Sequence, residues 1–284
     1  ELGAKLDKYH LLKHPFYQVY SVAAHAANTK PVYVTASREN GFFPNFSALS
    51  SDILDDTVAA YICSPSNPQG SIASVAYWKE LLLLSERHDF KIFSDECYSE
   101  IYRAEPPIGI LTVAKDIGVS KERVVLFNSL SKRSNLAGLR SGFAASGPNN
   151  IAALKTLRNY GGAPLSLPVQ KVSEKVWRDE VHVFENRELY KEKLNSADKI
   201  FAGNEDYTSP EAGFFLWLKV NDGEKATKIL WKEFGVRALP GEYLGREENG
   251  HNPGKSFIRL ALVAPLEEME DGLKRVRSCF YDKR

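Results

Sequence analysis

Residues 129–143 read SLSKRSNLAGLRSGF and follow RVVLFN at 123–128, an apolar run that is typical of a buried strand. Strands usually end in turns built from Gly, Pro, Asn or Asp. This stretch instead presents two serines and a lysine, with an arginine eight residues after the lysine. Hydroxyl and cationic groups gathered in one short turn indicate a ligand, and we expect an anionic one.

The chain before this turn alternates short apolar runs with amphipathic stretches. Strands are predicted at 57–64, 90–94 and 123–128, and helices at 74–90 and 109–118. The order strand, helix, strand, helix, strand predicts a parallel sheet with crossover connections.

The second half of the chain is helical and then mixed. The pattern predicts a helix at 149–160, a long charged amphipathic stretch at 168–202, strand candidates at 212–220 and 256–265, and helices near 223–235 and at 265–280. We therefore expect two domains: a large α/β domain at 1–175 that binds the ligand, and a small C-terminal α+β domain at 176–284. Because the chain opens with Glu1 in what reads as the middle of a domain, we expect the N-terminal part of the large domain to be missing.

The composition is that of an ordinary soluble globular protein. Its 284 residues carry 37 basic and 36 acidic side chains, so the net charge of +1 predicts no attraction to nucleic acid. The longest apolar runs are too short to span a bilayer, so no membrane association is expected. The three cysteines lack metal or disulfide spacing, which favours a reducing cytoplasm, and the six histidines lack metal spacing.

Polar side chains follow three consecutive predicted strands. Asn67 in SPSNPQG follows the first strand, Asp95 and Tyr98 in SDECY follow the second, and the serines and lysine of 129–132 follow the third. Ligands of parallel α/β sheets bind outside the carboxyl ends of the strands. We therefore expect these side chains to face one site.

Each motif also has a purely structural interpretation. SPSNPQG can be an ordinary turn, and Asp95 can cap a helix that begins at Glu96. Lys132 can be a solvated loop lysine, and Arg140 can be a structural ion-pair partner. Their joint occurrence at successive strand ends favours a ligand site.

One cofactor would use the whole set. A desolvated Lys132 can act as an amine nucleophile on an aldehyde. The two serines of the turn and Arg140 can hold a phosphate. Asp95 can pair with a protonated ring nitrogen, as pyridoxal 5′-phosphate (PLP) requires, while Tyr98 and Asn67 can donate to a phenolic oxygen.

The stretches SPSNPQG, SDECY, SLSKRSNLAGLRSG and FIRLAL resemble, in this order, the motifs of the class I/II aminotransferases, which are fold-type I PLP enzymes. The resemblance covers nearly the whole chain. It implies a mostly parallel central sheet flanked by helices, and a smaller α+β C-terminal domain. It also implies PLP as cofactor, small amino acid and 2-oxo acid substrates, and a homodimer.

The resemblance assigns a role to nine residues. Phe16 is a less favoured alternative to Tyr17 as the aromatic ring stacked on the cofactor. The implied set is: catalytic Lys132, Asp95 and Tyr98; cofactor-binding Tyr17, Asn67, Asp95, Tyr98, Ser129, Ser131, Lys132 and Arg140; and substrate-binding Arg259 and Asn67.

The amino-acid sequences of these motifs most resemble those of bacterial enzymes assigned as N-succinyldiaminopimelate aminotransferases of lysine biosynthesis. The implied reaction moves an amino group between N-succinyl-LL-2,6-diaminopimelate and 2-oxoglutarate. Arg38, Arg133 and Lys255 are candidates to bind its additional carboxylates, although plain surface charge is the favoured interpretation for each. Two alternatives stay open: another fold-type I PLP enzyme, such as an aspartate or aromatic aminotransferase or a carbon–sulfur lyase, and an inactive, truncated α/β protein.

Two nucleotide-binding motifs are excluded. NGHNPGKS at 249–256 nearly matches a phosphate loop, but Asn249 replaces the required glycine and a predicted strand follows instead of a helix. No Gly-x-Gly-x-x-Gly follows a predicted strand, so a dinucleotide-binding fold is not expected.

Overall fold

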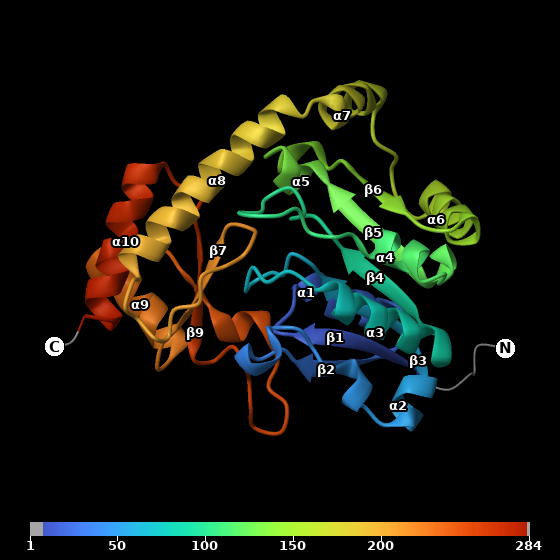
Figure 1. Cartoon of the computed structure of the whole chain (residues 1–284), viewed down its shortest axis with the longest axis horizontal. Helices are drawn as coiled ribbons and strands as arrows, with labels where there is room; N and C mark the ends of the chain where they lie inside the picture. Colours follow the sequence, from blue (N-terminus) through green and yellow to red (C-terminus); the bar gives the residue numbers. More distant parts are fainter. Residues whose placement is uncertain (1–7, 283–284) are drawn as a thin grey trace.

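A computed structural model describes residues 8–282, and the chain is organised around two β-sheets (Figure 1). The larger sheet has the order β2-β1-β3-β4-β5-β6, and the smaller has the order β7-β9-β8. The strands are Tyr9–His14 (β1), Lys30–Thr35 (β2), Thr57–Cys63 (β3), Lys91–Asp95 (β4), Val124–Ser129 (β5), Gly142–Ala145 (β6), Phe215–Lys219 (β7), Leu239–Pro240 (β8) and Phe257–Ala261 (β9).

Helices connect the strands and cover the sheets (Figure 1). Within residues 8–282 the α-helices are Gln18–Ala26 (α1), Ser51–Asp55 (α2), Val75–Arg87 (α3), Ile110–Asp116 (α4), Leu130–Arg133 (α5), Pro148–Tyr160 (α6), Leu167–Arg178 (α7), Val181–Ile200 (α8), Gly223–Phe234 (α9) and Leu266–Phe280 (α10).

The larger sheet is parallel from β2 to β5, and β6 pairs antiparallel with β5 at one edge. Its central strands bury apolar side chains such as Ile62 on β3 and Ile92 on β4, as expected of a parallel sheet that helices cover. Helix α3 begins where the Ser74 hydroxyl accepts a hydrogen bond from the Tyr77 amide, and it buries Trp78, Leu81 and Leu82. These elements confirm the predicted parallel sheet with crossovers.

The smaller sheet is antiparallel and has a core of its own. Leu216 and Leu218 on β7 pack with Ile258 on β9, with Leu230 on α9 and with Leu273 on α10. Strand β9 lies between β7 and β8. This arrangement confirms the expected small α+β part of the C-terminal region.

The amphipathic stretch at 168–202 forms two helices, α7 and α8, separated by residues 179 and 180. Figure 1 shows α8 running from the end of α7 to the helices that flank the smaller sheet. The boundary at 175/176 stays a prediction, and it falls three residues before α7 ends at Arg178.

Residues 8–282 contain neither a helix that could span a membrane nor a cluster of metal-binding side chains. No helix within residues 8–282 has the length and apolar character needed to cross a membrane. Over the same range, no group of three or more His, Cys, Asp or Glu side chains is placed to hold a metal ion.

Candidate active site

The ends of β3, β4 and β5 lie side by side at one edge of the larger sheet. Cys63 pairs with Asp95, and Asp95 pairs with Phe127, because the three strands run parallel and in register. Asn67 follows β3 by four residues, and Ser129 is the last residue of β5. The predicted convergence of the three motifs at one edge is therefore present.

The Asp95 carboxylate is held on both oxygens. Its Oδ1 accepts a hydrogen bond from the Cys97 amide at 3.1 Å, and its Oδ2 accepts one from the Tyr20 hydroxyl at 2.5 Å. Tyr20 is buried and stacks on Tyr61 at 5.1 Å between ring centroids. No helix begins at Glu96, so the capping interpretation of Asp95 is wrong.

Tyr20 was not among the site residues predicted from the sequence. It lies on α1 three residues after Tyr17, the spacing that places two side chains on one face of a helix. Tyr17 precedes this helix as its N-cap, is 44% exposed and meets Tyr20 edge to face at 5.7 Å. Phe16 is 1% exposed and stacks on Tyr33, so its ring is enclosed in the protein.

Lys132 lies on the short helix α5, directly after β5. Its Nζ is 5.3 Å from the ring centroid of Phe214 and 6.0 Å from that of Tyr98. Burial lowers the pKa of the Lys132 amine, and the positive charge of Arg259 acts in the same direction. A lowered pKa increases the fraction of neutral amine, which is the nucleophilic form.

Arg259 reaches from β9 to the loop after β3. Its Nη1 donates to Asn67 Oδ1 at 2.9 Å, and its guanidinium carbon lies 4.2 Å from the Phe215 ring centroid. Asn67 and Tyr98 are both buried, and burial raises the pKa of the Tyr98 phenol well above its usual value. The contact joins residues 192 positions apart, so both sheets contribute to the site.

The two serines of the turn contact each other. Ser129 Oγ donates to Ser131 Oγ at 2.8 Å and accepts from the Ser131 amide at 3.0 Å. Arg140 returns toward this edge because Gly142 pairs with Ser129 across β5 and β6. Its exposed side chain donates to the Ala137 carbonyl, and no hydrogen bond joins it to either serine in the described part of the chain.

The three candidate cations for distal carboxylates differ in their surroundings. Arg38 is exposed and lines a cavity of about 420 Å³ together with Pro15 and Trp217. Lys255 is exposed. The surface-charge interpretation is wrong for Arg133, which is 3% exposed and donates to backbone carbonyls at the end of α7.

Comparisons with known proteins identify relatives of this chain and of its fold. An LL-diaminopimelate aminotransferase of Dehalococcoides mccartyi is 28% identical over 276 residues, which covers 94% of this chain and 68% of the relative. An aminotransferase structure from Neisseria meningitidis has a TM-score of 0.91 at 35% identity, covering 96% of this chain and 70% of that one. A probable N-succinyldiaminopimelate aminotransferase from Thermus thermophilus has a TM-score of 0.84 at 26% identity, with coverages of 96% and 72%.

The model of the family described as aminotransferase class I and II matches residues 7–276, nearly the whole chain. The two sheets found here have the layout of this fold. The chain therefore belongs to the class I and II aminotransferases and is a PLP-dependent transaminase of fold type I.

Proposed function

We propose that the enzyme transfers an amino group between N-succinyl-LL-2,6-diaminopimelate and 2-oxoglutarate. Relatives named for diaminopimelate compounds support this skeleton as the amino donor. The observation that carries the substrate proposal is the cavity beside Trp217, because Trp217 is the direct cross-strand partner of Arg259. Side chains of such partners lie on the same face of a sheet.

The residues at the strand ends fit PLP in chemical type. PLP, when bound, supplies an aldehyde and a protonated ring that accepts electrons. Asp95 suits the ring nitrogen because hydrogen bonds from Tyr20 and from the Cys97 amide fix the orientation of its carboxylate. The other proposed contacts are Lys132 to the aldehyde, Asn67 and Tyr98 to the phenolic oxygen, Ser129, Ser131 and Arg140 to the phosphate, and Tyr17 against the ring.

Lys132 is proposed to move the proton of the reaction. Burial keeps its pKa below that of a free lysine, so its Nζ can take a proton from the substrate α-carbon. The same ammonium can return that proton later in the half-reaction. The Phe214 ring, whose centroid lies 5.3 Å from Nζ, supplies part of the apolar surroundings of the amine.

Arg259 is proposed to bind the α-carboxylate of the substrate. A guanidinium can make two parallel hydrogen bonds to a carboxylate, and Asn67 already holds one of its nitrogens at 2.9 Å. The Phe215 ring beneath the guanidinium fixes its plane. Arg259 would therefore set the direction in which the substrate α-carbon faces Lys132.

The distal arm of the substrate is proposed to enter the cavity of about 420 Å³. Arg38 donates to the carbonyls of Glu205 and Tyr207, and it forms no salt bridge with a carboxylate among residues 8–282. Lys219 also lines the cavity but is paired with Asp206 at 2.8 Å. Arg38 lies next to the Glu39 carboxylate and interacts with it electrostatically, but its guanidinium forms no salt bridge with it, so Arg38 is the proposed partner of the succinyl carboxylate.

The assignment of Lys132 can be tested by borohydride reduction of the PLP-loaded enzyme followed by peptide mass mapping. We expect the pyridoxyl label on Lys132 and its loss in Lys132→Arg. Lys13 is a stringent internal competitor, because burial lowers its pKa to about 7 and it donates to Gln69. A label on Lys13, or on any lysine other than Lys132, would refute the assignment.

The substrate can be tested with a panel of amino donors and 2-oxoglutarate. We expect the highest kcat/KM for the succinylated donor, and about a two- to fivefold increase of its KM in Arg38→Met, the loss expected for one partner of an exposed ion pair. Lys255→Met is the matched control, because Lys255 is also exposed but does not line the cavity. Equal values for the succinylated donor and for aspartate would contradict the proposal.

A second candidate donor is free LL-diaminopimelate. The relatives of 28% identity carry this name, and they are matched over 94% of the chain. The free compound lacks the succinyl carboxylate and keeps a distal ammonium, so Arg38→Met should impair its use less than that of the succinylated donor. A carbon–sulfur lyase would instead release pyruvate and ammonia from a sulfur amino acid without an amino acceptor.

We also propose a cytoplasmic homodimer. Relatives of this chain are biosynthetic enzymes, which supports the location. Leu157, Tyr160 and Leu167 expose large apolar side chains at the end of α6 and the start of α7, and a second copy could cover them. A monomeric mass of the full-length protein in light scattering would refute the dimer.

A further inference from the structure

The turn that carries Lys132 continues directly into three residues that contact the junction of α7 and α8. We propose that Arg133 is a positioning residue, which fixes the Lys132 turn relative to the smaller sheet and so aligns Lys132 with Arg259. The inference rests on the proposed role of Lys132 as the reacting amine. It gives a function to the one cation of the turn that neither the cofactor nor the substrate uses.

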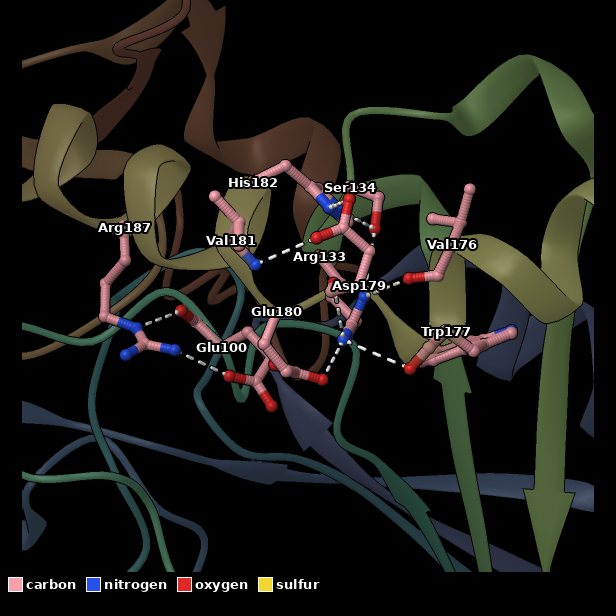
Figure 2. A network of polar contacts seen from close by, with 10 residues as sticks. All are labelled: Glu100, Arg133, Ser134, Val176, Trp177, Asp179, Glu180, Val181, His182 and Arg187. Atoms are coloured by element: carbon pink, nitrogen blue, oxygen red, sulfur yellow. Dashed lines mark hydrogen bonds and ion pairs between the residues drawn. The ribbon is translucent and has the colours of Figure 1, made fainter.

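Arg133 is bound from several sides at once (Figure 2). Its Nη1 donates to the Val176 carbonyl at 3.1 Å, and its Nη2 donates to the carbonyls of Trp177 and Asp179 and to the Glu180 carboxylate. The last carbonyls of a helix lack partners within the helix, and a cation there is also favoured by the helix dipole. The guanidinium therefore completes the end of α7.

The shape of the guanidinium matters as much as its charge. Its carbon lies 5.1 Å from the Trp177 ring centroid, so it also stacks on an aromatic ring while its nitrogens reach outward. A planar group with five donors can serve several acceptors in one plane, whereas an ammonium on a flexible stem serves fewer. With its donors occupied and its surface buried, Arg133 is not available to a substrate carboxylate.

The next two residues bind the first turns of α8. Ser134 Oγ lies 2.8 Å from His182 Nε2, and His182 Nδ1 lies 3.0 Å from a carboxylate oxygen of Asp179. Asn135 Nδ2 donates to Asn186 Oδ1 at 2.8 Å. We call residues 133–135 and their partners at 176–186 the anchor, and Figure 2 shows Arg133 and Ser134 with their partners.

The C-terminal half of α8 packs against the smaller sheet. Leu194 and Ala197 are buried in one core with Leu216 on β7 and Ile258 on β9, next to Arg259. Helix α8 is thus one continuous element between the anchor and the sheet that carries Arg259 (Figure 1). A helix of this length spans about 30 Å, so a tilt of roughly 5° at its start moves its end by about 2–3 Å.

A shift of about 2–3 Å is large for a reaction in which Lys132 and Arg259 must hold one substrate in a fixed orientation. A misplacement of about 1 Å can lower a rate roughly 100-fold when it changes the approach of reacting atoms. The anchor begins at the residue after Lys132. Through α8 it therefore connects Lys132 to the sheet that carries Arg259. Loosening Arg133 should therefore affect both the rate and the binding of the donor carboxylate.

The test compares Arg133→Lys with Arg178→Lys in the PLP-loaded enzyme. Arg133→Lys keeps the positive charge and loses the planar guanidinium. Arg178→Lys is the control, because Arg178 lies in the last turn of α7, which Arg133 binds, and its exposed side chain is paired with Glu174. We expect at least a tenfold loss of kcat/KM for Arg133→Lys and less than a twofold change for Arg178→Lys. A residue that only stabilises α7 would lower the melting temperature and leave kcat/KM of the folded enzyme unchanged.

Hydrogen exchange supplies a readout that does not depend on activity. In Arg133→Lys we expect faster exchange in both 130–136 and 179–187, because the anchor joins these segments. Faster exchange at the end of α7 alone, with kcat/KM within twofold of wild type, would overturn the proposal. An enzyme that shows the coupled exchange but transfers no amino group would refute the proposed function and keep the anchor.

A second variant covers the case in which Arg133→Lys fails to fold. Asn135→Ala removes an exposed side chain and one hydrogen bond, to Asn186, and it places alanine at a residue with φ of 53°, which costs about 1 kcal/mol, so folding should survive. We expect it to speed exchange at 179–187 and to lower kcat/KM at least threefold. Unchanged exchange and kcat/KM in Asn135→Ala would overturn the proposal.

Discussion

Replacing Glu96 with Gln should change the way in which stability depends on pH. Glu96 is 7% exposed, and its Oε1 accepts hydrogen bonds from the Ser94 hydroxyl and from the Ile110 amide at the start of α4, each at 3.1 Å. Burial raises the pKa of Glu96 from 4.5 to about 7, and the neighbouring Asp95 acts in the same direction. Gln keeps the accepting oxygen and cannot ionise.

The sign follows from proton binding in the two states. Between pH 4.5 and about 7 the folded protein holds the Glu96 proton and the unfolded chain has released it, so stability falls as the pH rises. At about 1.4 kcal/mol for each pH unit, the difference between 4.5 and about 7 corresponds to about 3 kcal/mol. This contribution is fully present below pH 4.5 and is lost above pH 7.

The assay is urea denaturation of both proteins at half-unit steps from pH 5 to 8. The wild-type curve alone would mislead, because burial lowers the pKa of His14 to about 4 and that of Lys13 to about 7. These two groups make stability rise with pH, His14 between pH 4 and 6.5 and Lys13 above pH 7. Both variants share these terms, so the difference in unfolding free energy between them isolates Glu96.

We expect this difference, wild type minus Glu96→Gln, to fall by about 2–3 kcal/mol between pH 5 and 7.5 and then to level off. A flat difference for Glu96→Gln, or one that rises with pH, would refute the reasoning that burial keeps this carboxyl protonated.

Three further substitutions probe the site and its frame. Tyr20→Phe removes the hydroxyl that donates to Asp95, so kcat should fall about tenfold, since a hydrogen bond to a charged group contributes roughly 1.5–3 kcal/mol; kcat within twofold of wild type would contradict this. Arg259→Met should raise the KM of the amino donor roughly 30-fold or more, and an unchanged KM would exclude Arg259 as the carboxylate ligand. Gly142→Ala places a Cβ 2.5 Å from the Asn128 carbonyl oxygen, so the unfolding free energy should drop by about 1–3 kcal/mol in urea denaturation, whereas an unchanged midpoint would argue against the clash.

The location of the site could be predicted from the sequence because parallel strands bring their carboxyl ends together. Asn67, Asp95 and Ser129 follow three apolar runs, and register alone places them at one edge. Their chemical types then restrict the ligand. The roles of individual residues at the cofactor stay predictions, because residue type and spacing do not give the distances between side chains.

Strand β2 was not predicted, for a local physical reason. It is an edge strand, its six residues are only partly buried or exposed, and Pro31 interrupts the pattern expected of a strand. An edge position tolerates proline because one side of the strand has no partner. Pairing with β1 along its full length therefore decides its structure more than its own sequence does.

Tyr20 was not predicted, and Arg133 was interpreted as surface charge, because their partners lie far away in the sequence. The Tyr20 hydroxyl meets Asp95 across 75 positions, and a tyrosine on an amphipathic helix is more often part of the core. Arg133 binds backbone carbonyls at 176–179, and a carbonyl carries no sequence signal. Three-dimensional packing alone reveals that the arginine beside Lys132 is buried.

The short connection from β5 to β6 has a consequence for how the chain can vary in length. The Leu130 amide donates to Ser141, the Leu136 amide donates to Leu130, and Gly142 faces Ser129, so both ends of the segment are tied together. One added or removed residue between 130 and 141 would break this closure and shift Lys132. Insertions and deletions should therefore be tolerated in the exposed connection at 247–250, and not within the segment that holds the lysine.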